Sequence, residues 1–135
     1  MPCNAVARAV GYVPVELARE LEALGAEAVG KALLTFLRRN FADLGEPRMQ
    51  LSGGQIRIVQ GNYLVLVIDG RIVVNAPYGD PKVVGQIKDA VTDFITGLAG
   101  LALQKRVVRA IRRAGYRVSK EQRAPNGALV LQVEL

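Results

Sequence analysis

The residues best suited to binding chemistry are cations gathered near the end of this 135-residue sequence. Residues 105–135 carry eight basic side chains against Glu121 and Glu134, which accounts for the whole formal net charge of +6. The charges of the first 104 residues cancel, because this part has ten basic and ten acidic side chains. A focused positive field attracts polyanions. The eight basic residues are Lys105, Arg106, Arg109, Arg112, Arg113, Arg117, Lys120 and Arg123.

The spacing of these cations predicts one basic helix face. At about 100° per residue, the five cations between residues 105 and 113 fall within about a third of the helix circumference. Arg117 and Lys120 extend the charge into a following strand, with Tyr116 alongside as a stacking residue. Arginine's planar fork suits phosphate oxygens. We therefore expect a nucleic-acid-binding surface that consists of Lys105, Arg106, Arg109, Arg112, Arg113, Tyr116, Arg117 and Lys120.

Two simpler explanations compete with this interpretation. An amphipathic helix needs a polar face, and cations near a helix C-terminus are favoured by the helix dipole. Acidic residues of the neutral part, Glu16, Glu20, Glu22 and Glu27, could also pair with the basic surface, within one subunit or between two. A basic patch without a binding motif is only the first step of a nucleic-acid argument. The partner therefore stays open between a nucleic acid and another copy of the protein.

Catalytic machinery is sparse in this sequence. There is no histidine, which removes the commonest general base and metal ligand. Cys3 has neither a metal-binding partner nor a base, so we expect a buried structural thiol. Asp89 and Asp93 share a helix face, which is more typical of a solvated surface than of a cation site. Tyr78 either lines a pocket or caps the sheet edge. We expect no enzyme, no cofactor and no metal site.

The segment from Leu51 to Gln55 spells LSGGQ, the signature of the ATP-binding-cassette ATPases. In that family the loop opens a helix and works beside a GxxxxGK[ST] segment, which this sequence lacks. The residues that follow, Ile56 to Val59, alternate with strand periodicity. The pattern therefore predicts a Gly-Gly loop between two strands.

Length and composition indicate one domain over residues 1–135, since half of the residues are apolar. The single cysteine and the absence of a charged-then-apolar leader favour a reducing, cytoplasmic compartment. The most apolar run, residues 94–103, is about half the length that crosses a bilayer, so we expect no membrane partner. Its glycines suggest close helix approach or a helix break.

Periodicity in the first half predicts one strand and two helices before a β-rich centre. The strand covers residues 3–13, the first helix starts near Pro14 and stops at Gly25, and the second ends near residues 45–47. Three short runs within residues 54–75 then predict an antiparallel meander, in which Asp69–Gly70 is a hairpin turn. An additional strand over Met49–Leu51 is a further option.

The second half predicts two helical stretches and two strands. Asp80 and Pro81 have the residue types of an N-cap and a first helical position. After a weak point at Gly97 and Gly100, the helix resumes and ends at Gly115. Two last strands flank a Pro-Asn-Gly turn. The order β-αα-βββ-αα-ββ predicts an α+β fold with helices on one face of an antiparallel sheet.

From the central strands onward, several short segments form a pattern: Val73-Val74, Gly79-Asp80, Arg109-Ala110, Ala114-Gly115-Tyr116, Val118, Glu121 and Asn126-Gly127. This pattern resembles a family of small proteins of unknown activity, the conserved hypothetical reading frames of chloroplasts and cyanobacteria. The Met-Pro-Cys start also looks like that of related short bacterial proteins, whereas the two helices over residues 14–45 depart from the family's short first helix. The resemblance implies an α+β fold and brings no activity, so no residue role is carried over.

The sequence thus predicts a small, non-enzymatic cytoplasmic protein that acts by binding, with nucleic-acid phosphates as its partner. The alternative is a homo-oligomeric structural or adaptor protein without a nucleic-acid role. Its motivation is the apolar run 94–103 and the exposed edges of a short meander, which are plausible self-association surfaces.

Overall fold

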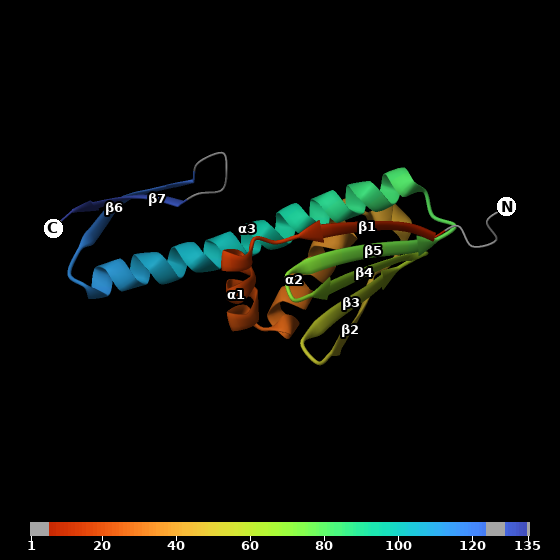
Figure 1. Ribbon diagram of the computed structural model, residues 1–135, viewed down its shortest axis with the longest axis horizontal. Helices are drawn as coiled ribbons and strands as arrows, with labels where there is room; N and C mark the ends of the chain where they lie inside the picture. The colour runs from red at the N-terminus through yellow and green to blue at the C-terminus, as the bar shows by residue number, and fades with distance from the viewer. Residues whose placement is uncertain (1–5, 124–128, 135) are drawn as a thin grey trace.

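The computed structural model describes residues 6–123 and 129–134. Its main body is a five-stranded antiparallel sheet in the order β1-β5-β4-β3-β2, with helices packed on one face (Figure 1). The predicted α+β class and the central meander are confirmed. The elements are β1 (Val6–Tyr12), α1 (Val15–Leu24), α2 (Ala26–Asn40), the 3-10 turn η1 (Ala42–Leu44), β2 (Arg48–Ser52), β3 (Gln55–Gln60), β4 (Tyr63–Ile68), β5 (Arg71–Pro77), α3 (Pro81–Arg113), β6 (Arg117–Arg123) and β7 (Leu129–Glu134).

Tight turns set the register of the meander. Asp69 and Gly70 both have positive φ, at 49° and 77°, as the hairpin turn predicted there requires. Gly53 and Gly54, at 56° and 81°, form the turn between β2 and β3, where Ser52 pairs with Gln55. The prediction of a Gly-Gly loop within LSGGQ is therefore confirmed. Cys3 and the predicted turn at residues 125–127 lie outside the described residues.

The meander strands do not form the edges of the sheet. β1 pairs with β5, and β2 pairs with β3, so the two edge strands of the sheet are β1 and β2. The prediction that the meander has exposed edges is wrong for this reason. The optional strand at residues 49–51 is present as β2, and it shields one side of the meander.

One face of the sheet and the three helices enclose the core. Its fully buried side chains include Leu33 and Leu37 of α2, Ile58 and Val74 of the sheet, and Ile87 of α3. Each such aliphatic side chain contributes about 1.5–3 kcal/mol when it leaves water. The rings of Phe36 and Phe94, with centroids 4.5 Å apart, stack between α2 and α3. These contacts fix α3 across the strands β1 and β5.

A buried glutamine explains why α2 ends earlier than predicted. The Gln60 side chain is 2% exposed, and its amide Nε2 donates to the carbonyl oxygens of Phe41, at 2.8 Å, and of Gly45, at 2.9 Å. A buried amide needs such acceptors, because an unpaired polar group in the core is costly. The chain after Asn40 therefore turns through η1 over Gln60 instead of continuing as a helix.

Helix α3 is continuous from Pro81 to Arg113, so the predicted break at Gly97 and Gly100 is wrong. The helix begins as predicted, with the Asp80 carboxylate accepting from the Lys82 amide at 2.9 Å. A glycine inside a helix costs only about 1 kcal/mol. Ile95 and Ala99, both fully buried, hold the helix on either side of Gly97. Gly97 itself has open space around the position of a Cβ, so no close approach occurs there.

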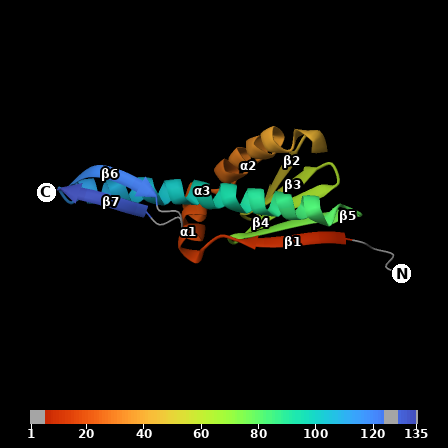
Figure 2. The same ribbon diagram turned by 90° about the horizontal axis from the view of Figure 1, so that it is seen from above.

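The last two strands form a separate two-stranded sheet and do not join the main one. A helix of 33 residues is about 50 Å long, whereas strands of seven residues extend about 24 Å. The end of α3 therefore extends past the sheet, and the β6–β7 hairpin lies against this overhang (Figures 1 and 2). We call residues 101–123 and 129–134 the C-terminal arm. Within the described chain, no helix has the length and apolar character needed to cross a membrane.

Replacing Gly97 by alanine should raise the free energy of unfolding by about 0.5–1 kcal/mol, because alanine loses less backbone entropy in a helix. Gly61→Ala is the contrasting variant and should lower it. Its Cβ would lie 2.5 Å from the Leu44 carbonyl oxygen, at a φ of +57°. Urea unfolding followed by circular dichroism measures both. A loss of stability in Gly97→Ala would contradict the continuous helix.

Candidate nucleic-acid interface

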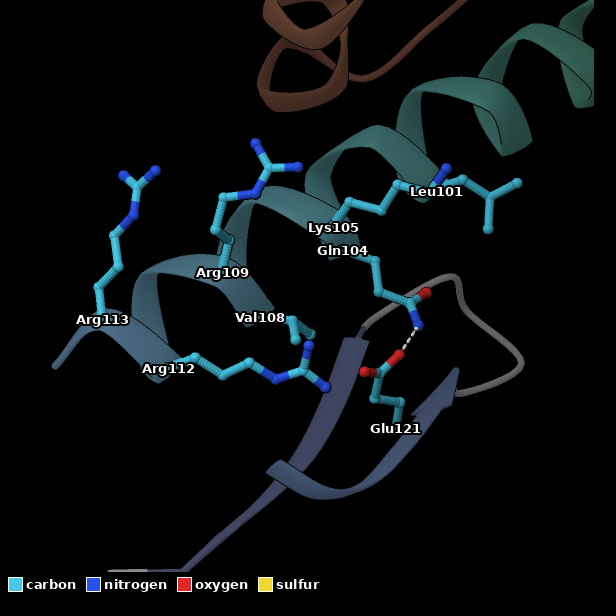
Figure 3. A pocket seen from close by; sticks show the side chains of 8 residues that line it. All are labelled: Leu101, Gln104, Lys105, Val108, Arg109, Arg112, Arg113 and Glu121. Carbon is cyan, nitrogen blue, oxygen red and sulfur yellow. Dashed lines mark hydrogen bonds between the residues drawn. The ribbon is translucent and has the colours of Figure 1, made fainter. Parts of the chain in front are cut away.

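The predicted basic cluster lies on the C-terminal arm, where α3 and the hairpin enclose a groove of about 540 Å³ (Figure 3). Seven of its lining residues come from α3, and the eighth comes from β6. They are Leu101, Gln104, Lys105, Val108, Arg109, Arg112, Arg113 and Glu121. Four of the eight predicted binding residues therefore line one concave surface.

The groove has an aliphatic floor and a cationic rim. Val108 is only 6% exposed, because the hairpin covers it, while Leu101 at one end is 54% exposed. The four cations, Lys105, Arg109, Arg112 and Arg113, are exposed. Arg112 reaches toward the hairpin, whereas Arg109 and Arg113 point away from it (Figure 3). The cations therefore fan out around the groove and do not converge on one point, which suits an extended anion better than a small one.

None of these four cations has an ion-pair partner among residues 6–123 and 129–134. The end of α3 does not use them as caps either. Its last carbonyl oxygens accept from backbone amides: Ala110 from Ala114, Ile111 from Tyr116, and Arg112 from Gly115. The helix dipole still favours cations at this end. Neither intramolecular pairing nor capping, however, occupies the guanidinium groups of Arg112 and Arg113.

One carboxylate lies inside the groove. Glu121 of β6 accepts a hydrogen bond from the Gln104 amide of α3 (Figure 3). This bond ties the hairpin to the overhanging helix. It also places a negative charge among the four cations, which would oppose a bound phosphate. The groove thus carries a net positive charge with a local point of repulsion.

Arg106 is engaged elsewhere, so it does not belong to the groove. Its guanidinium lies 2.6 Å from Glu20 of α1, whose side chain is only 8% exposed. The hydrogen bond and charge of Glu20 raise the pKa of Arg106. Sequence reasoning had named the glutamates of the first helices as alternative partners of the basic surface, and this pairing is confirmed for Glu20. The contact also fastens α1 to α3, far along the chain.

The three predicted residues after α3 lie apart from the groove lining. Arg117 pairs with Glu134 across the hairpin at 3.3 Å. Lys120 is next to Glu121 in the strand, and successive strand residues face opposite ways, so it lies on the outer side of the hairpin. Tyr116, 43% exposed, lies in the connection between α3 and β6. The single surface that the sequence predicted is therefore divided between three places.

Other candidate chemical groups remain dispersed. Asp89 and Asp93 are exposed on α3, and Lys88 pairs with Asp89. In the described part of the chain, no group of three or more His, Cys, Asp or Glu side chains gathers to hold a metal ion. Tyr78 follows β5, is 74% exposed and has a φ of 55°.

Sequence reasoning missed half of the groove. Leu101, Gln104 and Val108 belong to the helix but not to its basic stripe, and Glu121 belongs to another element. Helical periodicity groups residues on one face of one helix, so it could not find a groove that a hairpin completes. The only available signal was the turn at Gly115, which returns the chain toward α3.

Arg106→Gln should lower the melting temperature by several degrees, because it leaves the buried Glu20 carboxylate without a partner. The double variant Glu20→Gln/Arg106→Gln should recover most of this loss, since both charges are then absent. Thermal unfolding followed by circular dichroism measures the cycle. If the double variant is no more stable than Arg106→Gln, the loss of stability does not come from the unpaired Glu20 carboxylate, and the explanation is wrong.

Comparison with known proteins found no match to any family model, curated protein or solved structure. The resemblance to the chloroplast and cyanobacterial reading frames stays a prediction that these comparisons do not bear on.

Proposed function

We propose that this chain is a non-enzymatic, cytoplasmic binding protein that contacts nucleic-acid phosphates through the groove of its C-terminal arm. The observation that carries the proposal is the exposure of Lys105, Arg109, Arg112 and Arg113, none of which has an ion-pair partner in the described chain. Unpaired guanidinium groups along a groove offer the charge-assisted hydrogen bonds that phosphate oxygens accept. The cytoplasmic location rests on the single cysteine of the sequence.

The length of the cationic rim suits a short stretch of nucleic-acid backbone. Lys105 and Arg113 are eight residues apart, which is about 12 Å along a helix. One DNA strand carries a phosphate about every 3.4 Å of duplex axis, so this length covers about three or four phosphates. That number is close to the four cations available.

The chemistry of the groove favours backbone contacts over base readout. Phosphate contacts position a protein on nucleic acid but carry no sequence information. The groove lining has no aromatic residue on which a base could stack, and Tyr116 lies outside it. Glu121 further limits close approach at one side. We therefore propose binding that depends on charge and has little sequence preference.

The triple variant Arg109→Glu/Arg112→Glu/Arg113→Glu should abolish binding to a fluorescein-labelled oligonucleotide at low salt, measured by fluorescence anisotropy. For the unmodified protein, the logarithm of the association constant should fall with the logarithm of salt concentration with a slope of about −3. This value follows because each of four neutralised phosphates of a single strand contributes about −0.7.

Arg19→Glu/Arg39→Glu/Lys82→Glu is the matched control, because it changes the net charge equally at exposed positions of the three helices. It should retain most of the binding. Glu121→Gln is the converse variant and should strengthen binding by about twofold or more, since it removes the carboxylate from the groove. Absence of binding at low salt, or an equal loss in both triple variants, would contradict the proposal.

A homo-oligomeric adaptor is the second candidate function. The surfaces that first suggested it are partly occupied, because β1 and β2 flank the meander and Ile95, Ala99 and Gly100 of the apolar run are buried within the chain, although Leu101 is 54% exposed. The hairpin is the better reason to expect self-association, because Val130 and Val133 of β7 are 53% and 41% exposed. A two-stranded hairpin is marginal without further packing.

Light scattering coupled to size-exclusion chromatography separates the two candidates. The nucleic-acid proposal expects a mass near the 14.5 kDa of one chain in the absence of oligonucleotide. A stable dimer that Val130→Asp/Val133→Asp converts to a monomer would support the adaptor, because these changes place charge on the exposed apolar strand.

A further inference from the structure

The face of the main sheet that points away from the helices is a second charged surface. The strands β1–β5 contain four arginines and no aspartate or glutamate. The register places all four on this outer face: Arg8 is opposite Asn75, Arg71 is opposite Tyr12, Arg57 is opposite Leu66, and Arg48 is opposite Val59. The inner face, which includes Ile58, Val65 and Val74, packs against the helices.

Between these arginines runs an aliphatic strip, which we define as Val10, Val59, Leu64, Leu66, Ile68 and Val73. Val10 is aligned with Val73, and Val73 is aligned with Leu66 on the next strand. Val59 is 43% exposed, and Val10 and the three β4 residues of the strip are partly exposed, whereas Val73 at its centre is buried among its neighbours. No helix of the described chain covers this face (Figure 1). A contiguous apolar strip in this setting marks an interaction surface.

The central strand β4 reads YLVLVI and shows no polar alternation. A strand with one face in the core and one in water alternates apolar and polar residues, whereas a strand covered on both faces is continuously apolar. β5 behaves similarly, with Ile72, Val73 and Val74 in succession. The sequence of these strands is therefore that of a sheet covered on both sides, although the chain itself supplies helices for only one.

The dimensions of the strip suit a helix. It spans four neighbouring strands, from β1 through β5 and β4 to β3, so its width is about 14 Å, close to the 10–12 Å diameter of a helix. Arg8 and Arg71 lie on its β1–β5 side, and Arg48 and Arg57 lie on its β2–β3 side. At one end, a shallow hollow of about 640 Å³ is lined by Leu64 and Val59, with Arg8 and Arg57 at its edge.

We propose that the outer face of the sheet docks an acidic amphipathic helix of a partner protein. Its apolar stripe covers the aliphatic strip, and a large apolar side chain enters the hollow. Carboxylates along both flanks of the helix meet the arginines on the two sides. Charge complementarity carries the choice of partner, since the face holds only positive formal charge and each arginine can take a carboxylate in a bidentate contact.

Two other occupants fit this face less well. Face-to-face association with a second copy would bring together two sets of four arginines without any carboxylate, and like charges in an interface are costly. A nucleic acid would use aromatic stacking on an exposed sheet, but the strip has no aromatic residue. Tyr12 lies at its edge on β1, and Tyr63, which also lines the hollow, packs against the core.

The test uses a fluorescein-labelled helical peptide of about 20 residues, long enough to cross the sheet, with a leucine stripe flanked by glutamates. Anisotropy at physiological salt should show binding by the unmodified protein. A peptide with lysine in place of each glutamate should not bind. Arg8→Glu/Arg57→Glu should weaken the glutamate peptide about tenfold or more, because it reverses both charges at the hollow. Arg8→Ala/Arg57→Ala should also weaken binding of the glutamate peptide, and it does so without introducing a new charge.

Arg19→Glu/Arg39→Glu is the matched control on α1 and α2, and it should leave peptide binding unchanged. The groove triple variant should also leave it unchanged, whereas the two sheet variants should leave oligonucleotide binding by the groove unchanged. Circular dichroism confirms that each variant is folded. Failure of the glutamate peptide to bind, equal binding of the lysine peptide, or loss of oligonucleotide binding in the sheet variants would overturn the proposal. So would light scattering that shows self-association lost in Arg8→Glu/Arg57→Glu.

Discussion

The structure depends on a mismatch of length between α3 and the sheet on which it packs. The first part of the helix buries Val84, Ile87, Val91 and Ile95 against the strands and α2, which secures its position. A helix is stiff, so the residues beyond the sheet must continue in the same direction. They carry the basic residues away from the main body, and the hairpin can then contact only the overhang. The groove exists because α3, whose first part packs on the main sheet, is longer than that sheet.

The main body of the fold could be predicted from sequence because its signals are local. Asp69–Gly70 specifies a hairpin turn by positive φ, Asp80–Pro81 specifies a helix start, and Gly115 specifies its end. The order of helices and strands follows from these residues and from periodicity. The break at Gly97 was wrongly predicted because intrinsic propensity is a weak effect, and the burial of Ile95 and Ala99 on either side of it is a stronger one.

What could not be predicted depends on contacts between distant segments. No local signal pairs β1 with β5 or places Glu20 beside Arg106, since these partners are separated by about sixty residues or more. The candidate site was affected in the same way. The sequence predicted the cations as one continuous surface, but Glu20 draws Arg106 to α1, and strand alternation turns Lys120 outward. Only the three-dimensional arrangement separates cations with a partner from those without one.

The neutrality of the first 104 residues conceals a separation of charge that the fold creates. Their strands β1–β5 hold four of the ten cations and none of the carboxylates, so the remaining segments hold six cations against ten carboxylates. Strand pairing places all four arginines on one face, while some carboxylates outside the sheet are already paired, as in Glu27 with Lys31 and Glu46 with Arg38. A head-to-tail contact between copies would use this polarity, but such a contact repeats without closing and gives growing assemblies. A separate acidic partner uses the same polarity in a complex of defined size.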